Sequence, residues 1–194
     1  MLTTLLPFLA ATASLDSAPP CQELRLPRTP TADGATYALA EGVQLVFGHD
    51  GALDTESDYG QRAMLYTSGR GVVRRTYYSA GAGDSYAMQP TFFGHCGPHE
   101  LLILADIGTE YSWGFRVFAY DGRHLRDLGE IPIAVKGDID LESPIPFVKL
   151  TPHDQMIELT FTMDVFKDPG ERSQHALAAK DVRYEIGAAS VRAK

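Results

Sequence analysis

Short runs in which apolar and polar residues alternate are the feature that most restricts what this chain can fold into. The clearest run covers residues 156–165, where every second residue from Ile157 to Val165 is apolar and the residues between them are Glu158, Thr160, Thr162 and Asp164. A period of two is typical of a β-strand with one buried face and one solvent face. We therefore expect Phe161 to lie in a core and Thr160 to face solvent.

Comparable runs, separated by Gly, Pro and Asp, recur along most of the chain. They predict about nine strands, at residues 43–47, 63–67, 72–79, 101–105, 113–120, 131–135, 147–150, 156–165 and 182–186. Asp50-Gly51, Asp121-Gly122 and Asp168-Pro169-Gly170 predict turns between strands. The expected fold is all-β, an antiparallel β-sandwich or a partly closed barrel of about eight or nine strands.

Two of these segments allow finer predictions. Residues 101–105 form a continuous apolar run, which predicts a central strand that is covered on both faces. The alternation in residues 113–120 assigns three side chains to each face of the strand: Trp113, Phe115 and Val117 to one, and Arg116, Phe118 and Tyr120 to the other.

The domain organisation follows from length and local composition. With 194 residues, 44% of them hydrophobic, the chain can build one sizeable core. Residues 1–13 carry no charge, are rich in Leu and end in Ala11-Thr12-Ala13, which predicts a signal peptide that is cleaved after Ala13 and too short to span a membrane. Residues 14–35 are expected to form a linker or extended arm, and residues 36–194 a single β domain.

The formal net charge of −8 bears on the class of partner. We do not expect nucleic acid to be a partner, because phosphate binding needs clustered Lys and Arg and the sequence has no such cluster. An acidic surface suits a basic protein partner, since opposite charges speed encounter.

Cys21 and Cys96 are the only cysteines of the sequence. An even number of cysteines in an exported chain predicts one disulfide bond, and we place the protein in the periplasm or outside the cell. Cys96 also lies between His95 and His99, so a zinc site is the alternative role for that thiol.

The segment Asp-Ile-Gly-Thr-Glu-Tyr-Ser-Trp-Gly at residues 106–114 is the most distinctive motif of the sequence. It resembles a motif of uncharacterised exported bacterial β-rich proteins, and the resemblance extends over residues 100–165. That group implies an exported β-rich domain and brings no activity with it. The architecture, a signal followed by an acidic β domain, is also similar to that of periplasmic lysozyme inhibitors of the invertebrate-type class and related immunity proteins, which implies inhibition of a cell-wall hydrolase.

The candidate binding residues lie in two loops, Asp84 and Tyr86 in the first and Glu110, Tyr111 and Trp113 in the second. Tyr111 and Trp113, between Gly108 and Gly114, either form an exposed aromatic platform or fill the core. The core is favoured for Trp113, because the single Trp of a small domain is usually buried. The alternative function is a cell-wall glycan hydrolase that uses Asp106 and Glu110 as a carboxylate pair.

Acidic residues also recur in a stretch that contains Asp50, Asp54, Glu56 and Asp58. Oxygen ligands at alternate positions are typical of calcium loops, so calcium is the one candidate cofactor. Tyr59 and Leu65 stand where the helix-flanked calcium loop requires Gly and Glu, and a solvated loop is the simpler interpretation. No nucleophile motif occurs, so the sequence favours a non-enzymatic binding protein, with an inhibitor or immunity protein as the specific form.

Overall fold

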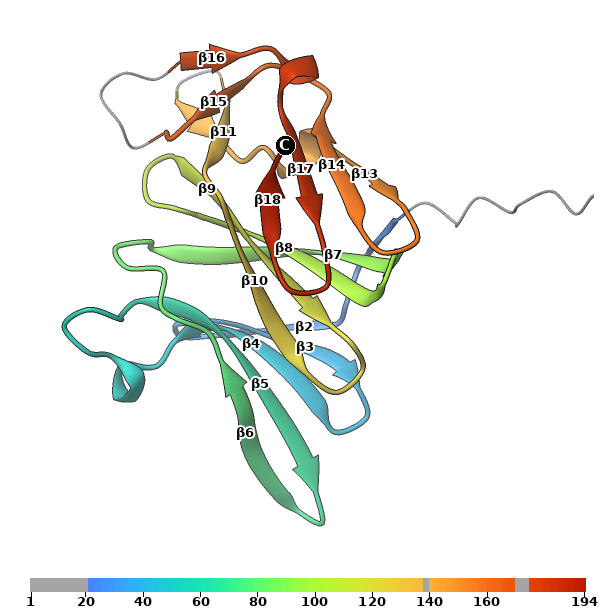
Figure 1. Ribbon diagram of the computed structural model, residues 1–194. Helices are drawn as coiled ribbons and strands as arrows, with labels where there is room; N and C mark the ends of the chain where they lie inside the picture. Colours follow the sequence, from blue (N-terminus) through green and yellow to red (C-terminus); the bar gives the residue numbers. More distant parts are fainter. Residues whose placement is uncertain (1–20, 138–139, 170–174) are drawn as a thin grey trace, which may run out of the picture.

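A computed structural model describes residues 21–137, 140–169 and 175–194. The expected signal peptide at residues 1–13 and the turn residue Gly170 lie outside the described residues. The expected all-β antiparallel sandwich is confirmed (Figure 1). The strands are more numerous than eight or nine, because the described residues form eighteen, several of them only two to four residues long.

The strands form four sheets. The outer sheet has the order β2 (Arg28–Thr31), β3 (Gly34–Ala40), β4 (Val43–His49), β5 (Gln61–Gly69), β6 (Val72–Tyr78). The central sheet has the order β1 (Gln22–Leu24), β7 (Ala87–Cys96), β8 (His99–Gly108), β9 (Ser112–Tyr120), β10 (Leu125–Ile131).

Two smaller sheets, which we call the cap sheets, lie on the side of the central sheet opposite the outer sheet (Figure 1). One has the order β13 (Val148–Pro152), β14 (Ile157–Phe161), β17 (Arg183–Ile186), β18 (Val191–Ala193). The other has the order β12 (Leu141–Glu142), β11 (Ile133–Lys136), β15 (Val165–Lys167), β16 (His175–Leu177). Three short 3-10 helices complete the described elements: η1 (Gly51–Leu53), η2 (Ile145–Phe147) and η3 (Ala179–Asp181).

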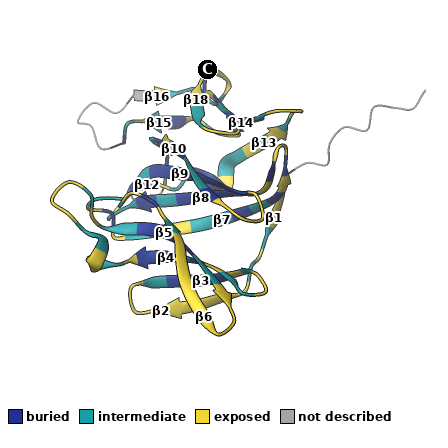
Figure 2. Cartoon of the chain, turned by 60° about the horizontal axis from the view of Figure 1, so that its bottom comes forward, coloured by how far each residue is buried: buried dark blue, intermediate teal, exposed yellow. Residues whose placement is uncertain are grey.

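The central sheet is buried on both faces, which confirms the prediction for residues 101–105. Leu102 and Leu104 of β8 pack into the core that the central sheet shares with the cap sheets. The alternate residues Leu101, Ile103 and Ala105 pack into a second core, shared with the outer sheet. A strand between two apolar layers needs apolar residues at every position, and β8 accordingly appears as a largely buried element in Figure 2.

The N-terminal part of the described chain is tied to the central sheet. Cys21 and Cys96 form the expected disulfide, so the sulfur of Cys96 is not free to bind zinc. Directly after Cys21, β1 pairs with β7 from Gln22↔Gly94 to Leu24↔Phe92, and the chain then crosses to β2 in the outer sheet. The region expected as a linker or extended arm thus contributes an edge strand to each of these two sheets.

The prediction of a single strand at residues 156–165 is wrong. β14 ends at Phe161, and β15 begins at Val165 in the other cap sheet, where it pairs with Leu177. Between them the amide of Thr162 donates to the carbonyl of Phe147 (2.9 Å), and the Asp164 carboxylate accepts from the amide of Ala179 (3.0 Å). Phe161 and Val165 both remain buried in the same core, so the apolar pattern continues although the strand does not.

The predicted faces of residues 113–120 also need one correction. Phe115 and Val117 enter the core under the cap sheets, whereas Trp113 packs, half-buried, against the core on the opposite face. The pairing of β9 with β8 passes from Ile107↔Gly114 to Gly108↔Ser112 and skips Trp113, which is the extra residue of a β-bulge. Gly114 there has a φ of +121°, a conformation that residues with a side chain rarely adopt.

The Asp121-Gly122 turn between β9 and β10 is confirmed. The Asp121 carboxylate accepts hydrogen bonds from the amides of Arg123 (3.1 Å) and His124 (2.8 Å) and so closes the hairpin. Asp50 acts in a similar way, because its carboxylate accepts from the amide of Ala52 (3.1 Å) at the start of η1.

Candidate functional site

Ser85 joins the two loops that the sequence nominates for binding. Its hydroxyl lies 2.6 Å from the carbonyl of Ala87, and it accepts a hydrogen bond from the amide of Gly108 (2.9 Å). The amide of Tyr86 donates to the carbonyl of Gly108 (3.0 Å). These bonds hold the loop with Asp84 and Tyr86 against the loop with Glu110 and Tyr111.

The nominated side chains differ in exposure. Tyr86 is 76% exposed, and Asp84 and Glu110 are also exposed. Tyr111 and Trp113 are half-buried, Trp113 because it packs against a core. The Tyr59 hydroxyl donates to the Asp84 carboxylate (3.0 Å), and this hydrogen bond raises the pKa of Tyr59 above its usual value. The two loops therefore present an aromatic ring beside exposed carboxylates.

A cavity of about 610 Å³, the loop cavity, lies under the first of these loops. Nine of its lining residues carry polar or charged side chains: Asp33, His49, Asp54, Tyr59, Gln61, Asp84, Ser85, Tyr86 and Thr109. Three of the nine are carboxylates. A cationic group is the ligand that such a lining favours.

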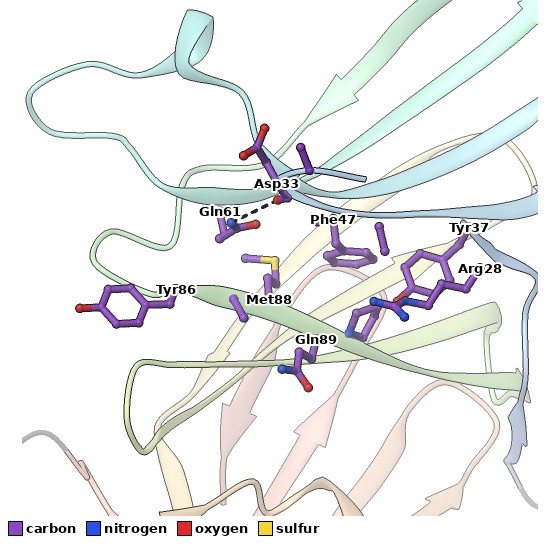
Figure 3. Close-up of a pocket in the computed structure, with 13 residues that line it drawn as sticks. Arg28, Asp33, Tyr37, Phe47, Gln61, Tyr86, Met88 and Gln89 are labelled. Atoms are coloured by element: carbon purple, nitrogen blue, oxygen red, sulfur yellow. Dashed lines mark hydrogen bonds between the residues drawn. The ribbon is translucent and has the colours of Figure 1, made fainter. Parts of the chain in front are cut away.

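A second concave surface, the inter-sheet groove, adjoins the loop cavity and shares Asp33, Gln61 and Tyr86 with it. It encloses about 680 Å³ where β7 and the outer sheet diverge. Figure 3 shows Tyr37, Phe47 and Met88 between these layers and Tyr86 and Arg28 at the two ends. Gln61 donates to the carbonyl of Asp33 (3.4 Å) at its rim. The floor of the groove thus consists of apolar side chains that are each less than a tenth exposed, and its rim is polar.

The two carboxylates of the alternative function, Asp106 and Glu110, line one small cavity of about 200 Å³, the carboxylate cavity, together with Glu142. Burial raises the pKa of Asp106, and hydrogen bonds from Ser112 (2.8 Å) and Ser143 lower it in part. On its other side Asp106 lines a cleft of about 350 Å³, the strand-edge cleft, with Glu23 and Gln89. Asp106 is therefore a carboxyl group whose surroundings favour the protonated form.

The acidic stretch expected to form a calcium loop is held by cations of the chain. Arg62 is fully buried, and its guanidinium donates to Asp54 (2.9 Å) and Asp58 (3.4 Å). His49 contacts Asp54 (2.6 Å), and Arg75 contacts Asp50 (2.5 Å), while Glu56 is exposed. The described residues contain no group of three or more His, Cys, Asp or Glu arranged to hold a metal ion. Calcium binding here stays a prediction.

Hydrogen bonds lower the pKa values of two of these carboxyl groups. The bond with His49 is the main cause for Asp54, and the bond from the amide of Gly81 (2.5 Å) is the main cause for Asp58. Both groups therefore stay ionised well below neutral pH. Each of the two is therefore an anion at physiological pH, and Arg62 pairs with both.

Two buried arginines support the binding loops, and sequence reasoning missed both. Arg62 donates to the carbonyl of Ser79 (3.2 Å), and Arg116 donates to the carbonyl of Ala80 (2.7 Å) and pairs with Asp127. They fix the backbone just before the loop with Asp84. The spacing of Arg62, four residues after Asp58 and eight after Asp54, was the available signal.

Comparisons with protein-family models, curated proteins and solved structures found no match for this chain. Its function has to be argued from the site. In the described part of the chain, no helix has the length and apolar character needed to cross a membrane.

Proposed function

We propose that this protein is a periplasmic or secreted, non-enzymatic binding protein that inhibits a basic cell-wall hydrolase. The observation that carries the proposal is the junction at Ser85, which holds the loop of Asp84 and Tyr86 against the loop of Glu110 and Tyr111. The net charge of −8 favours a cationic partner, and the disulfide is typical of an oxidising compartment.

The two kinds of side chain in these loops have different roles in the proposal. Asp84 and Glu110 are exposed, so they attract a basic partner over distances set by the Debye length, about 8 Å at physiological ionic strength. Tyr86 offers a large exposed ring that enters a cleft of the partner, and buried aromatic anchors of this kind dominate binding energy. The buried arginines keep the loops ordered, which reduces the entropy lost on binding.

A panel of basic lysozymes and peptidoglycan amidases tests this function. Each enzyme is assayed at low salt with an excess of the protein, and inhibition of at least one member is expected. The Tyr86→Ala variant should weaken that inhibition, whereas Val73→Ala, on the exposed strand β6 away from these loops, should not. A panel whose activities all stay unchanged contradicts the inhibitor proposal.

The second candidate is a cell-wall glycan hydrolase, favoured by one observation. Asp106, whose pKa is raised by burial, shares a cavity with the exposed Glu110. A carboxyl group with a raised pKa beside a second carboxyl group is the arrangement that glycoside hydrolysis requires of its acid and its nucleophile or base.

Peptidoglycan turnover separates the two candidates. The hydrolase requires turnover by the protein alone, lost in both Asp106→Asn and Glu110→Gln. Turnover that survives both substitutions excludes this carboxylate pair, and no turnover with inhibition of an added hydrolase supports the first candidate.

A further inference from the structure

The outer edge of β7 is open along half of the strand. β1 covers that edge only as far as the pair Leu24↔Phe92, after which the chain leaves for β2. Over residues 87–91, the described part of the chain pairs β7 with β8 alone. An open edge of this kind presents unpaired backbone groups to another extended chain.

Pro90 lies in the middle of this open segment. Proline donates no backbone hydrogen bond, and in sheets it is confined to edge strands with its nitrogen turned outward. It interrupts the row of donors and so limits pairing to a short segment. This feature disfavours edge-to-edge association of whole sheets and still leaves carbonyl groups available as acceptors.

Concave surfaces lie on both faces of the open segment. The inter-sheet groove is on one side and the strand-edge cleft on the other, and Gln89 and Pro90 line both. Figure 3 shows Met88 pointing toward Phe47 and Gln89 pointing to the opposite side of β7. Side chains of an added strand would alternate between these two faces in the same way.

The two faces select different side chains. On the groove side, the floor consists of Tyr37, Phe47 and Met88, and the cation Arg28 stands at one end. On the cleft side, Gln89 lies directly opposite Asp106 in the strand pairing, and Glu23 lines the same cleft. Apolar side chains fit the first face and cationic side chains the second.

From this geometry we infer that residues 87–91 of β7 bind an extended segment of the basic partner by strand addition. The segment has alternating apolar and cationic side chains, apolar toward the groove lined by Phe47 and Met88 and cationic toward the exposed carboxylate of Glu23. The inference rests on the proposed function for the class of partner, and it adds the binding mode and the sequence pattern that is recognised.

The test is an NMR titration of the whole protein with a capped peptide of about eight residues in which valine and lysine alternate, long enough to cross the open edge. Shifts of the amides of residues 87–91 are expected. A peptide of the same composition, with the valines and lysines in two blocks, should bind about tenfold more weakly, since only alternation matches both faces. N-methylation of every second backbone amide of the valine–lysine peptide should also weaken its binding, because strand addition uses backbone hydrogen bonds.

Gln89→Lys should lower the affinity for the alternating peptide about tenfold, because residue 89 is exposed and the new lysine repels the lysines of the peptide. Val73→Lys places the same charge on the edge strand β6, where Val73 is 64% exposed, and should leave the affinity unchanged. Three results would overturn strand addition: equal affinities for the two peptides, amide shifts confined to the loops around Asp84 and Glu110, or inhibition of a basic hydrolase without any peptide binding. None of these results contradicts the proposed binding through the acidic loops.

Discussion

Asp106 holds a carboxyl group where burial opposes its charge. Its pKa in the folded protein is raised above the ordinary value of 3.8, so the folded state binds the proton more tightly than the unfolded chain. This proton stabilises the folded protein fully when the pH is below the pKa that Asp106 has in the unfolded chain. The stabilisation is lost as the pH rises through the pKa that Asp106 has in the folded protein. Above the folded pKa the ionised group therefore lowers the free energy of unfolding.

Asp106→Asn should consequently raise the free energy of unfolding at pH 7, because asparagine carries no charge and still accepts from Ser112. The advantage of the variant should shrink as the pH falls through the folded pKa of Asp106 toward about 3.8. Urea unfolding at several pH values measures both effects. A variant that is less stable than the parent at pH 7, or whose difference is the same at every pH, contradicts this account of the site.

Arg62 is the other single residue on which the site depends. Arg62→Met should lower the free energy of unfolding by about 3 kcal/mol, since it removes bonds to Asp54, Asp58 and the carbonyl of Ser79 from a fully buried position. Arg75→Met, which removes the partly exposed pair with Asp50, should cost less than about 1 kcal/mol. Equal losses in chemical denaturation would mean that Arg62 does not organise the loops.

At the scale of elements, β14 shows how much of a strand can be predicted from the alternation of apolar and polar residues. The burial pattern from Ile157 to Phe161 is the one that alternation predicts, yet the strand ends there because β15 pairs with β11 and β16 in a different sheet. A switch of sheet depends on partners distant in sequence, so local alternation cannot reveal it. The bulge at Trp113 is a second example, because the alternation of residues 113–120 gives no sign of the extra residue.

Phe161→Asp should prevent folding, because Phe161 is 6% exposed and contacts Tyr184 in a core. An unpaired buried charge costs several kcal/mol, against a total stability of about 5–15 kcal/mol. Thr160→Asp should be tolerated, since Thr160 lies between Lys149 and Arg183 on the neighbouring strands. The yield of soluble protein and the circular dichroism of both variants test this, and equal loss would show that the two faces are misassigned.

The disulfide joins β1 to the far end of β7. Replacing Cys21 and Cys96 together with serine should lower the free energy of unfolding by about 4 kcal/mol, given their sequence separation of 75 and a chain-entropy model of the cross-link. Denaturation with and without a reducing agent measures the loss in the parent protein. A loss below about 1 kcal/mol would mean that β1 stays in place without the cross-link.

For the whole molecule, the sequence could predict the class of fold, the doubly covered strand and the disulfide, because each depends on local pattern or on a count of cysteines. It could not predict that three layers form two cores, since strands far apart in the sequence decide which sheets face each other. The inter-sheet groove was missed for that reason, because its lining comes from β2, β3, β4, β5 and β7 and from the loops beside them. The sequence predicts that the loops of Asp84 and Glu110 both bind the partner, and the bonds at Ser85 show that these loops are in contact.

The most direct measurement tests the proposed inhibition: it follows the association rate of this protein with each basic hydrolase of the panel as salt is raised. The account predicts that the rate falls as ionic strength shortens the Debye length from about 30 Å at 0.01 M to about 8 Å at physiological salt. The Asp84→Asn, Glu110→Gln double variant should start slower and show a weaker salt dependence, while Tyr86→Ala should change mainly the dissociation rate. An association rate that does not change with salt, or that the double variant leaves unaltered, would contradict acidic loops that recruit a basic partner.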